Sequence, residues 1–262
     1  LLPLLNEEGL VIIETRTTFR ELEFEQAYQV CRYQPRVEGS FSRIERWWRD
    51  GEPASTFWLI HDATGHLHCL GKTIAGRVAS PQLLTDSYNP RIGEWLLEES
   101  VSPTGEHMIY CYQDENNVGV SPDKQYSLGT LPHLMEIRYG NLHPAANLYL
   151  WSSDNVNSAT SGVEWLFKLI FDYGARGLDP HSQPQDKIEP DQHWTARHDP
   201  FSRFDYGYEV RCHRLCRQII MFHQNFTELN QGCPTVVGRL ILDYDENAVL
   251  SRLIGARLWA YD

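Results

Sequence analysis

Long hydrophobic runs are missing from the 262-residue sequence. No apolar window approaches the roughly 20 residues that a membrane-spanning helix needs, and no secretory signal peptide is visible. We therefore expect no direct insertion into a membrane. An initiator methionine is also missing: the chain opens on Leu1-Leu2-Pro3 and stops just after an apolar run, so we expect a fragment of a longer protein.

Positive charge is scarce. The sequence has 23 lysines and arginines against 35 aspartates and glutamates, which gives a formal net charge of −12, and no basic run is present. Proteins that bind the nucleic-acid backbone need a concentrated positive surface. The composition therefore excludes nucleic acid as an expected partner.

Recognisable catalytic motifs are absent as well. The sequence contains no glycine-rich phosphate loop, no nucleophile elbow and no HExxH motif. We therefore expect that the chain is not an enzyme, and we assign no catalytic, cofactor-binding or metal-binding residues.

No convincing amphipathic helix is found, whereas strand signals are abundant. Aromatic residues make up 12% of the sequence, and aromatic side chains favour strands. Two hairpins share one style, a Trp-Leu strand followed by a Thr-Gly turn: Phe57–Ile60 leads through Gly65 into 66–70, and Glu94–Leu97 leads through Gly105 into 106–113. Glycine supplies the positive φ that such tight turns need.

The most regular stretch is 163–173, VEWLFKLIFDY. Alternate residues of a strand point to opposite faces, so Trp165, Phe167, Leu169 and Phe171 form one apolar face. We expect this face to be buried and Lys168, on the other face, to reach water or a polar lumen. Accordingly, Phe167→Ala should lower the free energy of unfolding strongly, whereas Lys168→Ala should lower it very little.

The remaining chain predicts further strands and loops. We expect a short strand at 147–151, a very long strand at 206–223 that is curved or bulged, and a hairpin formed by 236–244 and 248–259. The proline-rich stretch 174–200 is expected to be a flexible or contact-making arm. The fold class is therefore all-β: one domain over 1–262 with long antiparallel strands and hairpins that form a curved sheet wall, with long polar loops.

Three groups of residues could form sites, and for each of them we expect a structural role instead. His61, His66 and His68 could hold a metal, but they lack a fourth ligand. The cysteines are expected to be small buried hydrophobes, and the zinc-like set is irregularly spaced: Cys212, His213, Cys216 and Cys233. The carboxylates could supply the acid pair of a glycosidase, but sequence cannot place them across a cleft: Glu98, Glu99, Asp243 and Asp245.

Several stretches, taken in order, resemble a known family. They are Tyr33–Gly39, Arg43–Trp47, Trp95–Ser100, Leu134–Asn141, Phe171–Gly174, Asp199–Ser202, Tyr208–Arg211, Arg214–Arg217 and Met221–His223. This ordered set resembles the Salmonella virulence plasmid B protein domain, which also opens the B component of insecticidal toxin complexes. The resemblance covers most of the chain from about residue 28.

The resemblance implies a non-catalytic structural segment of a toxin-complex B-type protein. Such a segment contributes to a hollow β-shell that encloses and delivers a toxic partner segment. The implied partners are the remainder of the parent chain and an Rhs-repeat C-type toxin component, with an A-type pore component reached through other regions of the parent. The implied localisation is export as part of a large toxin complex, after assembly in the cytoplasm.

Two activities of the family are not carried over. The virulence plasmid B protein joins this domain to an actin-modifying ADP-ribosyltransferase, but the sequence has no Glu-x-Glu motif in a suitable strand setting. The calcium loops of the toxin-complex propeller are not seen either. The alternative that remains open is a β-sandwich carbohydrate-binding module or a glycosidase that uses paired carboxylates.

Unpaired strand edges are expected at one or both terminal hairpins, 30–48 and 236–259. Such edges pair with other chains unless they are covered. We expect them to meet the rest of the parent protein, so that the isolated chain self-associates or is poorly soluble.

Overall fold

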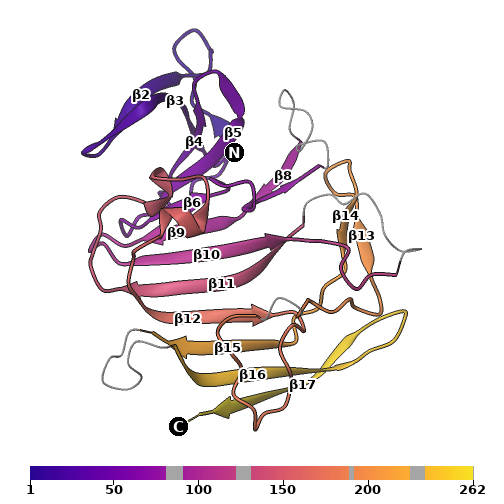
Figure 1. Ribbon diagram of the computed structural model, residues 1–262. Helices are drawn as coiled ribbons and strands as arrows, with labels where there is room; N and C mark the ends of the chain where they lie inside the picture. Colours follow the sequence, from indigo (N-terminus) through magenta and orange to yellow (C-terminus); the bar gives the residue numbers. More distant parts are fainter. Residues whose placement is uncertain (81–90, 122–130, 189–191, 225–233, 262) are drawn as a thin grey trace. The chain divides into compact units, whose positions relative to one another are not determined.

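The computed structural model describes residues 1–80, 91–121, 131–188, 192–224 and 234–261 (Figure 1). Within these residues the helical elements are short: the 3₁₀ helix η3 (Tyr149–Trp151) and the single turn α1 (Val156–Ala159). All pairs of strands with a described register are antiparallel. The predicted all-β, antiparallel fold class is confirmed.

The chain packs as two compact units. Unit 1 is Leu1–Ile109 with His143–Val163, and unit 2 is Tyr110–Leu142 with Glu164–Asp262. One strand, β10 (His107–Asp114), contributes residues to both. The expectation that 1–262 forms one domain stays a prediction.

Unit 1 is built on a sheet with the strand order β1-β3-β4-β5-β6-β9, followed by the first residues of β10, and β2 also pairs with β3. A separate ribbon is formed by β7 and β8. The bounds are β1 Leu2–Pro3, β2 Ile13–Phe19, β3 Leu22–Gln34, β4 Arg43–Arg49, β5 Glu52–His61, β6 Leu67–Leu70, β7 Arg77–Ala79, β8 Ile92–Trp95 and β9 Leu97–Val101.

The two Thr-Gly turns lie where the sequence predicts them. Gly65 (φ 89°) joins β5 to β6, and Gly105 (φ 85°) joins β9 to β10. The strand before the second turn is predicted too early in the chain: it is β9, whereas Trp95 ends β8, which pairs with β7. The Trp95 ring lies so close to Gly71 that a Cβ there would be 2.3 Å from it, and the indole N–H donates to the Thr56 carbonyl at 3.0 Å.

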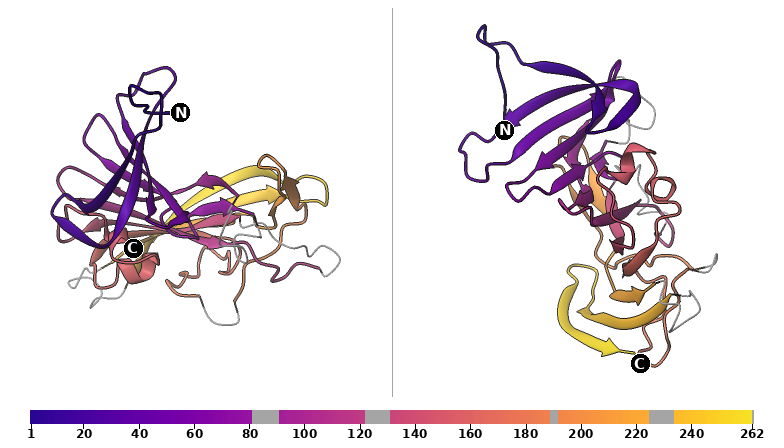
Figure 2. Two further views of the ribbon diagram at one scale, coloured as in Figure 1. Left: turned by 90° about the horizontal axis from the view of Figure 1, so that it is seen from above. Right: turned by 90° about the vertical axis from the view of Figure 1, so that its left-hand side faces the viewer.

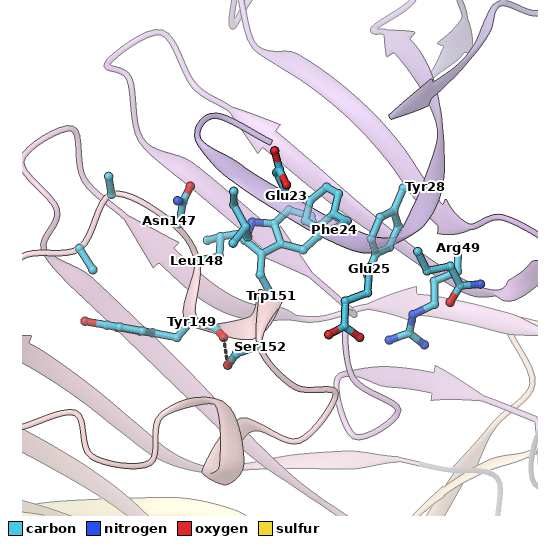
Figure 3. Close-up of a pocket in the computed structure, with 14 residues that line it drawn as sticks. Glu23, Phe24, Glu25, Tyr28, Arg49, Asn147, Leu148, Tyr149, Trp151 and Ser152 are labelled. Atoms are coloured by element: carbon cyan, nitrogen blue, oxygen red, sulfur yellow. Dashed lines mark hydrogen bonds between the residues drawn. The ribbon is translucent and has the colours of Figure 1, made fainter. Parts of the chain in front are cut away.

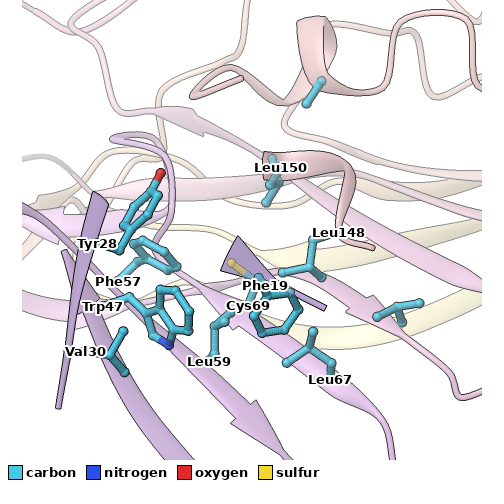
Figure 4. Close-up of a cluster of buried hydrophobic side chains, with 12 residues drawn as sticks. Phe19, Tyr28, Val30, Trp47, Phe57, Leu59, Leu67, Cys69, Leu148 and Leu150 are labelled. Carbon is cyan, nitrogen blue, oxygen red and sulfur yellow. The ribbon is translucent and has the colours of Figure 1, made fainter. Parts of the chain in front are cut away.

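The core of unit 1 lies on one face of this sheet (Figure 4). Trp47, Phe57 and Leu59 are at most 1% exposed, and Leu148 and Leu150 from the segment 143–163 pack on them. The strand predicted at 147–151 is therefore wrong: this segment forms η3. Its first backbone N–H groups, on Tyr149 and Leu150, donate to the Glu99 carboxylate at 2.8 and 3.0 Å instead of pairing with a strand.

In unit 2 the strand order is the remainder of β10, then β11-β12-β15-β16-β17, and a small ribbon is formed by β13 and β14. Figure 1 shows β11, β12, β15, β16 and β17 lying side by side in this order. The bounds are β11 Pro132–Asn141, β12 Trp165–Asp172, β13 Phe201–Arg203, β14 Val210–Cys212, β15 Gln218–His223, β16 Thr235–Asp245 and β17 Arg252–Ala260.

The single long strand predicted at 206–223 is wrong, because the chain leaves the extended pattern between β14 and β15. Arg214 is 2% exposed, and its guanidinium donates to Glu115 and to the carbonyls of Trp194 and Val118. A buried cation needs this full set of acceptors. The local chain therefore bends toward them instead of continuing a sheet ladder.

The C-terminal hairpin of β16 and β17 is confirmed. Its register runs from Gly238↔Ala260 to Asp245↔Arg252, with an irregularity at Asp243/Tyr244. Figure 2 shows both strands curving together, as expected where a bulge increases local twist.

Candidate functional site

One face of the unit 2 sheet is buried, and we call it the covered face. Cross-strand partners share a face, and the register gives three rows: Lys168–Phe222–Val236, Ile170–Ile220–Arg239 and Asp172–Gln218–Ile241. All nine residues are buried. Four of them carry polar or charged groups, so something other than apolar packing must satisfy them.

The segment 174–186, here called the arm, supplies those partners. Arg239 is 1% exposed and donates to the carbonyls of Gly177, Asp179 (2.8 Å) and Ser182. Tyr261 adds a hydrogen bond from its hydroxyl to the Pro180 carbonyl at 3.0 Å. The arm is therefore held on the covered face by side chains of β16 and of the residue after β17.

Asp172 anchors the start of the arm. Its carboxylate is fully buried, accepts backbone N–H groups of residues 174–176, and receives the Gln218 amide at 2.8 Å. Arg176 forms an ion pair with it at 3.4 Å. Further along the arm, Asp186 pairs with Lys168, whose ammonium lies 5.7 Å from the Phe222 ring.

These contacts reverse the faces predicted for 163–173. The alternation is correct, but Lys168 and Asp172 are buried, whereas Phe167, Leu169 and Phe171 are only half-buried. Of the four residues that we expect to be buried on that face, Trp165 alone is buried, with 4% of its surface exposed. The physical reason is that the polar arm, which directly follows β12, folds back and covers the mixed face.

The opposite side of the same sheet, here called the open face, is apolar and half-buried. Its rows include Ile137–Leu169–Met221 and Phe171–Ile219–Leu240–Leu258. Tyr139, Phe167 and His223 form a third row, with ring centroids 5.0 and 5.2 Å apart. A contiguous apolar surface of this kind marks an interaction site more often than scattered single residues do.

The open face ends at an exposed edge strand. β17 pairs only with β16 in the described part of the sheet, and Leu253, Ile254 and Leu258 are 57, 70 and 79% exposed. Its arginines are engaged, because Arg257 pairs with Asp243 and Arg252 with Asp245 across the hairpin. The other predicted edge is wrong for β4, which lies between β3 and β5.

Unit 1 contains an open pocket of about 680 Å³ (Figure 3). Residues 22–26 of β3, with Tyr28 and Arg49, form one wall, and residues 145–152 form the other. The aromatic rings of Phe24 and Trp151 lie 4.8 Å apart within it. Nothing in the sequence indicates this pocket, because its two walls are at least 96 residues apart in the chain.

The paired glutamates of β9 have structural partners. Glu98 is fully buried, and its carboxyl receives the Thr73 N–H at 2.9 Å and contacts the Thr73 hydroxyl. Burial raises the pKa of Glu98 to about 7. Glu99, also fully buried, pairs with His107 at 2.7 Å and caps η3. With both carboxyl groups enclosed, they form no acid pair across a groove.

The acidic residues of the C-terminal hairpin are also paired. Hydrogen bonds from Arg257, at 2.7 Å, lower the pKa of Asp243. Asp245 pairs with Arg252 at 2.6 Å. Both aspartates therefore stabilise the hairpin, and the glycosidase hypothesis has no support from either pair of carboxylates.

The three histidines of the first hairpin do not converge. His66 and His68 stack with centroids 6.3 Å apart, and His68 contacts Ser100 at 2.9 Å. His61 is the cross-strand partner of Leu67, so it points to the opposite face. In the ranges that the structure describes, no cluster of His, Cys, Asp or Glu has a metal-binding arrangement.

The described members of the zinc-like set each contact protein groups other than a shared metal site. Cys212 lies 3.3 Å from the Arg214 carbonyl, and Cys216 lies 3.5 Å from the Gln218 carbonyl. The His213 backbone N–H donates to Glu115 at 2.8 Å. Cys233 lies outside the described residues. Burial raises the pKa of Cys216 to about 11, so this thiol stays protonated at neutral pH.

Sequence reasoning missed a second buried ionic centre in unit 2. Glu115 accepts from Arg214 at 2.7 Å and contacts His133 at 3.1 Å. Burial opposes ionisation here, but the hydrogen bonds from His133 and from the His213 backbone outweigh it, so the pKa of Glu115 is lowered. The partners lie 18 and 99 residues away, a separation that no local pattern reveals.

No helix within the described ranges has both the length and the apolar character needed to cross a membrane.

Comparison with known proteins gives one consistent result. The family model described as Salmonella virulence plasmid 65kDa B protein (SpvB) matches residues 4–225. The chain is 43% identical over 272 residues to the mono(ADP-ribosyl)transferase SpvB of Salmonella typhimurium (strain 14028s / SGSC 2262) and equally so to that of Salmonella dublin. These matches cover 98% of this chain but 44% of the relatives, so the chain spans less than half of their length.

Solved structures agree. The N-terminal domain of effector protein SpvB from Salmonella typhimurium strain LT2 superposes with a TM-score of 0.88 at 41% identity, which covers 100% of this chain and 78% of that one. A TcdB2-TccC3 crystal structure matches with a TM-score of 0.82 at 32% identity over 98% of this chain and 12% of that one. A Photorhabdus luminescens Tc holotoxin pore matches with a TM-score of 0.83 at 33% identity over 95% and 11%. The similarity thus lies with the N-terminal domain of that effector and with part of a toxin-complex chain.

Proposed function

This chain belongs to the Salmonella virulence plasmid 65kDa B protein family, and on that premise we propose that it is a non-catalytic structural segment of a toxin-complex B-type protein. In this role it forms part of the hollow β-shell that encloses and delivers a toxic partner segment. The likeness to TcdB2-TccC3 over 98% of the chain supports this role.

The observation that carries the proposal is the open face of unit 2. Its apolar rows run across five strands, from Ile137 on β11 to Leu258 on β17, without becoming fully buried. Burying apolar area is worth about 25 cal/mol per Å², so this face gains free energy when a further layer or an enclosed chain covers it. A shell wall provides such a cover, whereas a free-standing domain would leave the face in water.

The edge strand β17 supports the partner assignments. Its unpaired backbone groups and exposed Ile254 and Leu258 suit the addition of another strand. The strand would come from the remainder of the parent chain, and the completed shell would close against an Rhs-repeat C-type toxin component. The A-type pore component would be bound through other regions of the parent. Export would follow assembly in the cytoplasm, as part of the large complex.

Co-expression of the parent protein with its C-type partner tests this role. The parent should protect the toxic segment from protease, and deletion of residues 1–262 should abolish that protection. If the toxic segment remains equally protected after the deletion, the structural role is wrong.

Point variants sharpen the test. Leu169→Glu places a charge on the open face, where it should reduce the yield of the assembled complex. Leu178→Glu, at an exposed leucine of the arm, is the matched control and should leave the yield unchanged. Equal yields of the assembled complex from the two variants would show that the open face is not needed for assembly.

A further inference from the structure

The pocket of unit 1 has the size of a ligand site. Its volume of about 680 Å³ falls within the roughly 300–1,000 Å³ of small-molecule pockets. The shell role proposed above makes no use of it. The walls come from β3 and from the segment around η3, both well tied to the core, because Trp151 packs on Phe19, Trp47 and Phe57.

One side of the pocket is aromatic. Phe24 and Trp151 are half-buried, in contrast to the fully packed Trp47 beneath them, and both line the cavity. Figure 3 shows Trp151 reaching toward Phe24 and Tyr28. Aromatic rings provide a large apolar surface at low cost in conformational entropy, which suits a flat ligand face made of C–H groups.

The rim of the pocket carries charges of both signs. Glu23 and Glu25 line it on β3, and both are exposed. Arg49 lines it as well and is paired with Asp154. The two carboxylates disfavour an anionic ligand, and Arg49 contributes little net positive charge because Asp154 and Glu52 pair with it. A neutral ligand that can both donate and accept hydrogen bonds fits this rim.

Two polar atoms in the lining have unmet hydrogen-bonding capacity. The indole N–H of Trp151 and the side-chain oxygen of Asn147 are buried and have no hydrogen-bond partner in the part of the chain that the structure describes. An unsatisfied buried polar group costs roughly 1–3 kcal/mol. One atom is a donor and the other an acceptor. Both are closed off from solvent, so a ligand hydroxyl satisfies them only after a shift of the Asn147 or Trp151 side chain.

We propose that this pocket binds a neutral saccharide, with a sugar ring against Phe24 and Trp151 and its hydroxyl groups on Glu25, Gln26 and Asn147. A sugar ring presents a C–H face and several hydroxyls in one molecule, which matches the aromatic wall and the mixed rim together. Binding involves no covalent chemistry.

The test is calorimetric titration of the 262-residue chain with cellobiose, maltose, lactose and N,N′-diacetylchitobiose. At least one should bind, with a Kd on the order of 1 mM or tighter, as for a few new polar contacts. Arginine methyl ester and inorganic phosphate serve as charged probes. If none of the four sugars binds, or if only a charged probe does, the proposal is overturned.

Variants place the binding in this pocket. Glu25→Ala should weaken the Kd about fivefold to tenfold, as expected for the loss of one hydrogen bond. Trp151→Phe should weaken it as well, because the smaller ring offers less surface to the sugar. Glu21→Ala removes an exposed carboxylate just outside the lining and should leave the Kd within about twofold, as a surface change does. A sugar that binds Glu25→Ala and Trp151→Phe as tightly as it binds the unaltered chain would contradict the assignment of this pocket. Circular dichroism verifies that each variant is folded.

Discussion

At the scale of single residues, Glu98 couples the stability of unit 1 to pH. A methyl group at Gly76 would lie only 2.2 Å from the Glu98 carboxyl carbon, which shows how tightly the segment 73–76 encloses this carboxyl. Desolvation by this burial disfavours the charged form. The pKa therefore rises from the ordinary 4.5 to about 7.

The sign of the pH dependence follows from this shift. Because the folded-state pKa exceeds the unfolded one, the contribution of Glu98 to stability is complete below about pH 4.5 and is lost as the pH rises through 7. Relative to Glu98→Gln, the wild-type free energy of unfolding should fall by about 3 kcal/mol between pH 4.5 and 8. Urea denaturation of both proteins measures the difference, and a difference that does not change with pH would refute the shift.

Lys168 is a second residue at which burial changes the expectation. Because it is buried, pairs with Asp186 and lies over Phe222, Lys168→Ala should lower the free energy of unfolding by about 2 kcal/mol. The sequence had predicted a negligible cost. Lys187→Ala, at an exposed lysine, is the control and should cost under about 0.5 kcal/mol. Equal costs in thermal or urea denaturation would show that Lys168 is solvated.

At the scale of elements, the arm is held by one dominant clamp. Arg239→Ala should release it, because the guanidinium bonds to three arm carbonyls and to Gln218. Hydrogen–deuterium exchange should rise in 174–186, with the strands themselves less affected. Arg257→Ala removes an exposed arginine paired across the hairpin and should leave exchange in the arm unchanged. Unchanged exchange in Arg239→Ala would mean that the arm is held without this clamp.

The elements also show what local sequence can and cannot determine. Alternation at 163–173 and the glycines at 65 and 105 predict strands and turns correctly, because these signals depend on neighbouring residues. The choice of the buried face fails, because Asp172 and Lys168 are satisfied by the arm and the arm by Arg239, some 60 residues later. The break before β15 escapes prediction for the same reason, since Arg214 is held by the distant Glu115.

At the scale of the whole molecule, family membership was predictable and the pocket was not. Short motifs in a fixed order, such as Leu134–Asn141, identify the family without knowledge of contacts, and the family model confirms it over 4–225. The pocket depends on residues near 25 and near 150 meeting in space. Neither stretch carries a recognisable motif, so composition and spacing gave no signal.

The isolated chain should self-associate through β17. Its arginines are neutralised by Asp243 and Asp245, so charge repulsion gives this edge little protection. Light scattering at increasing concentration should show dimers or larger species, and Ile254→Lys should shift the chain toward monomer. Leu10→Lys, at an exposed leucine outside the named strands, is the control and should not. A wild-type chain that stays monomeric at high concentration would contradict this prediction.

The arm clamp also sets an order of events during synthesis. Arg239 holds carbonyls that precede it by 57 to 62 residues, so the arm leaves the ribosome before its clamp has been made. At a translation rate of about 5–20 residues per second, the arm waits roughly 3–12 seconds for β16. During that interval the arm lacks its Arg239 contacts, so it stays accessible to proteases and chaperones until β16 has been synthesised.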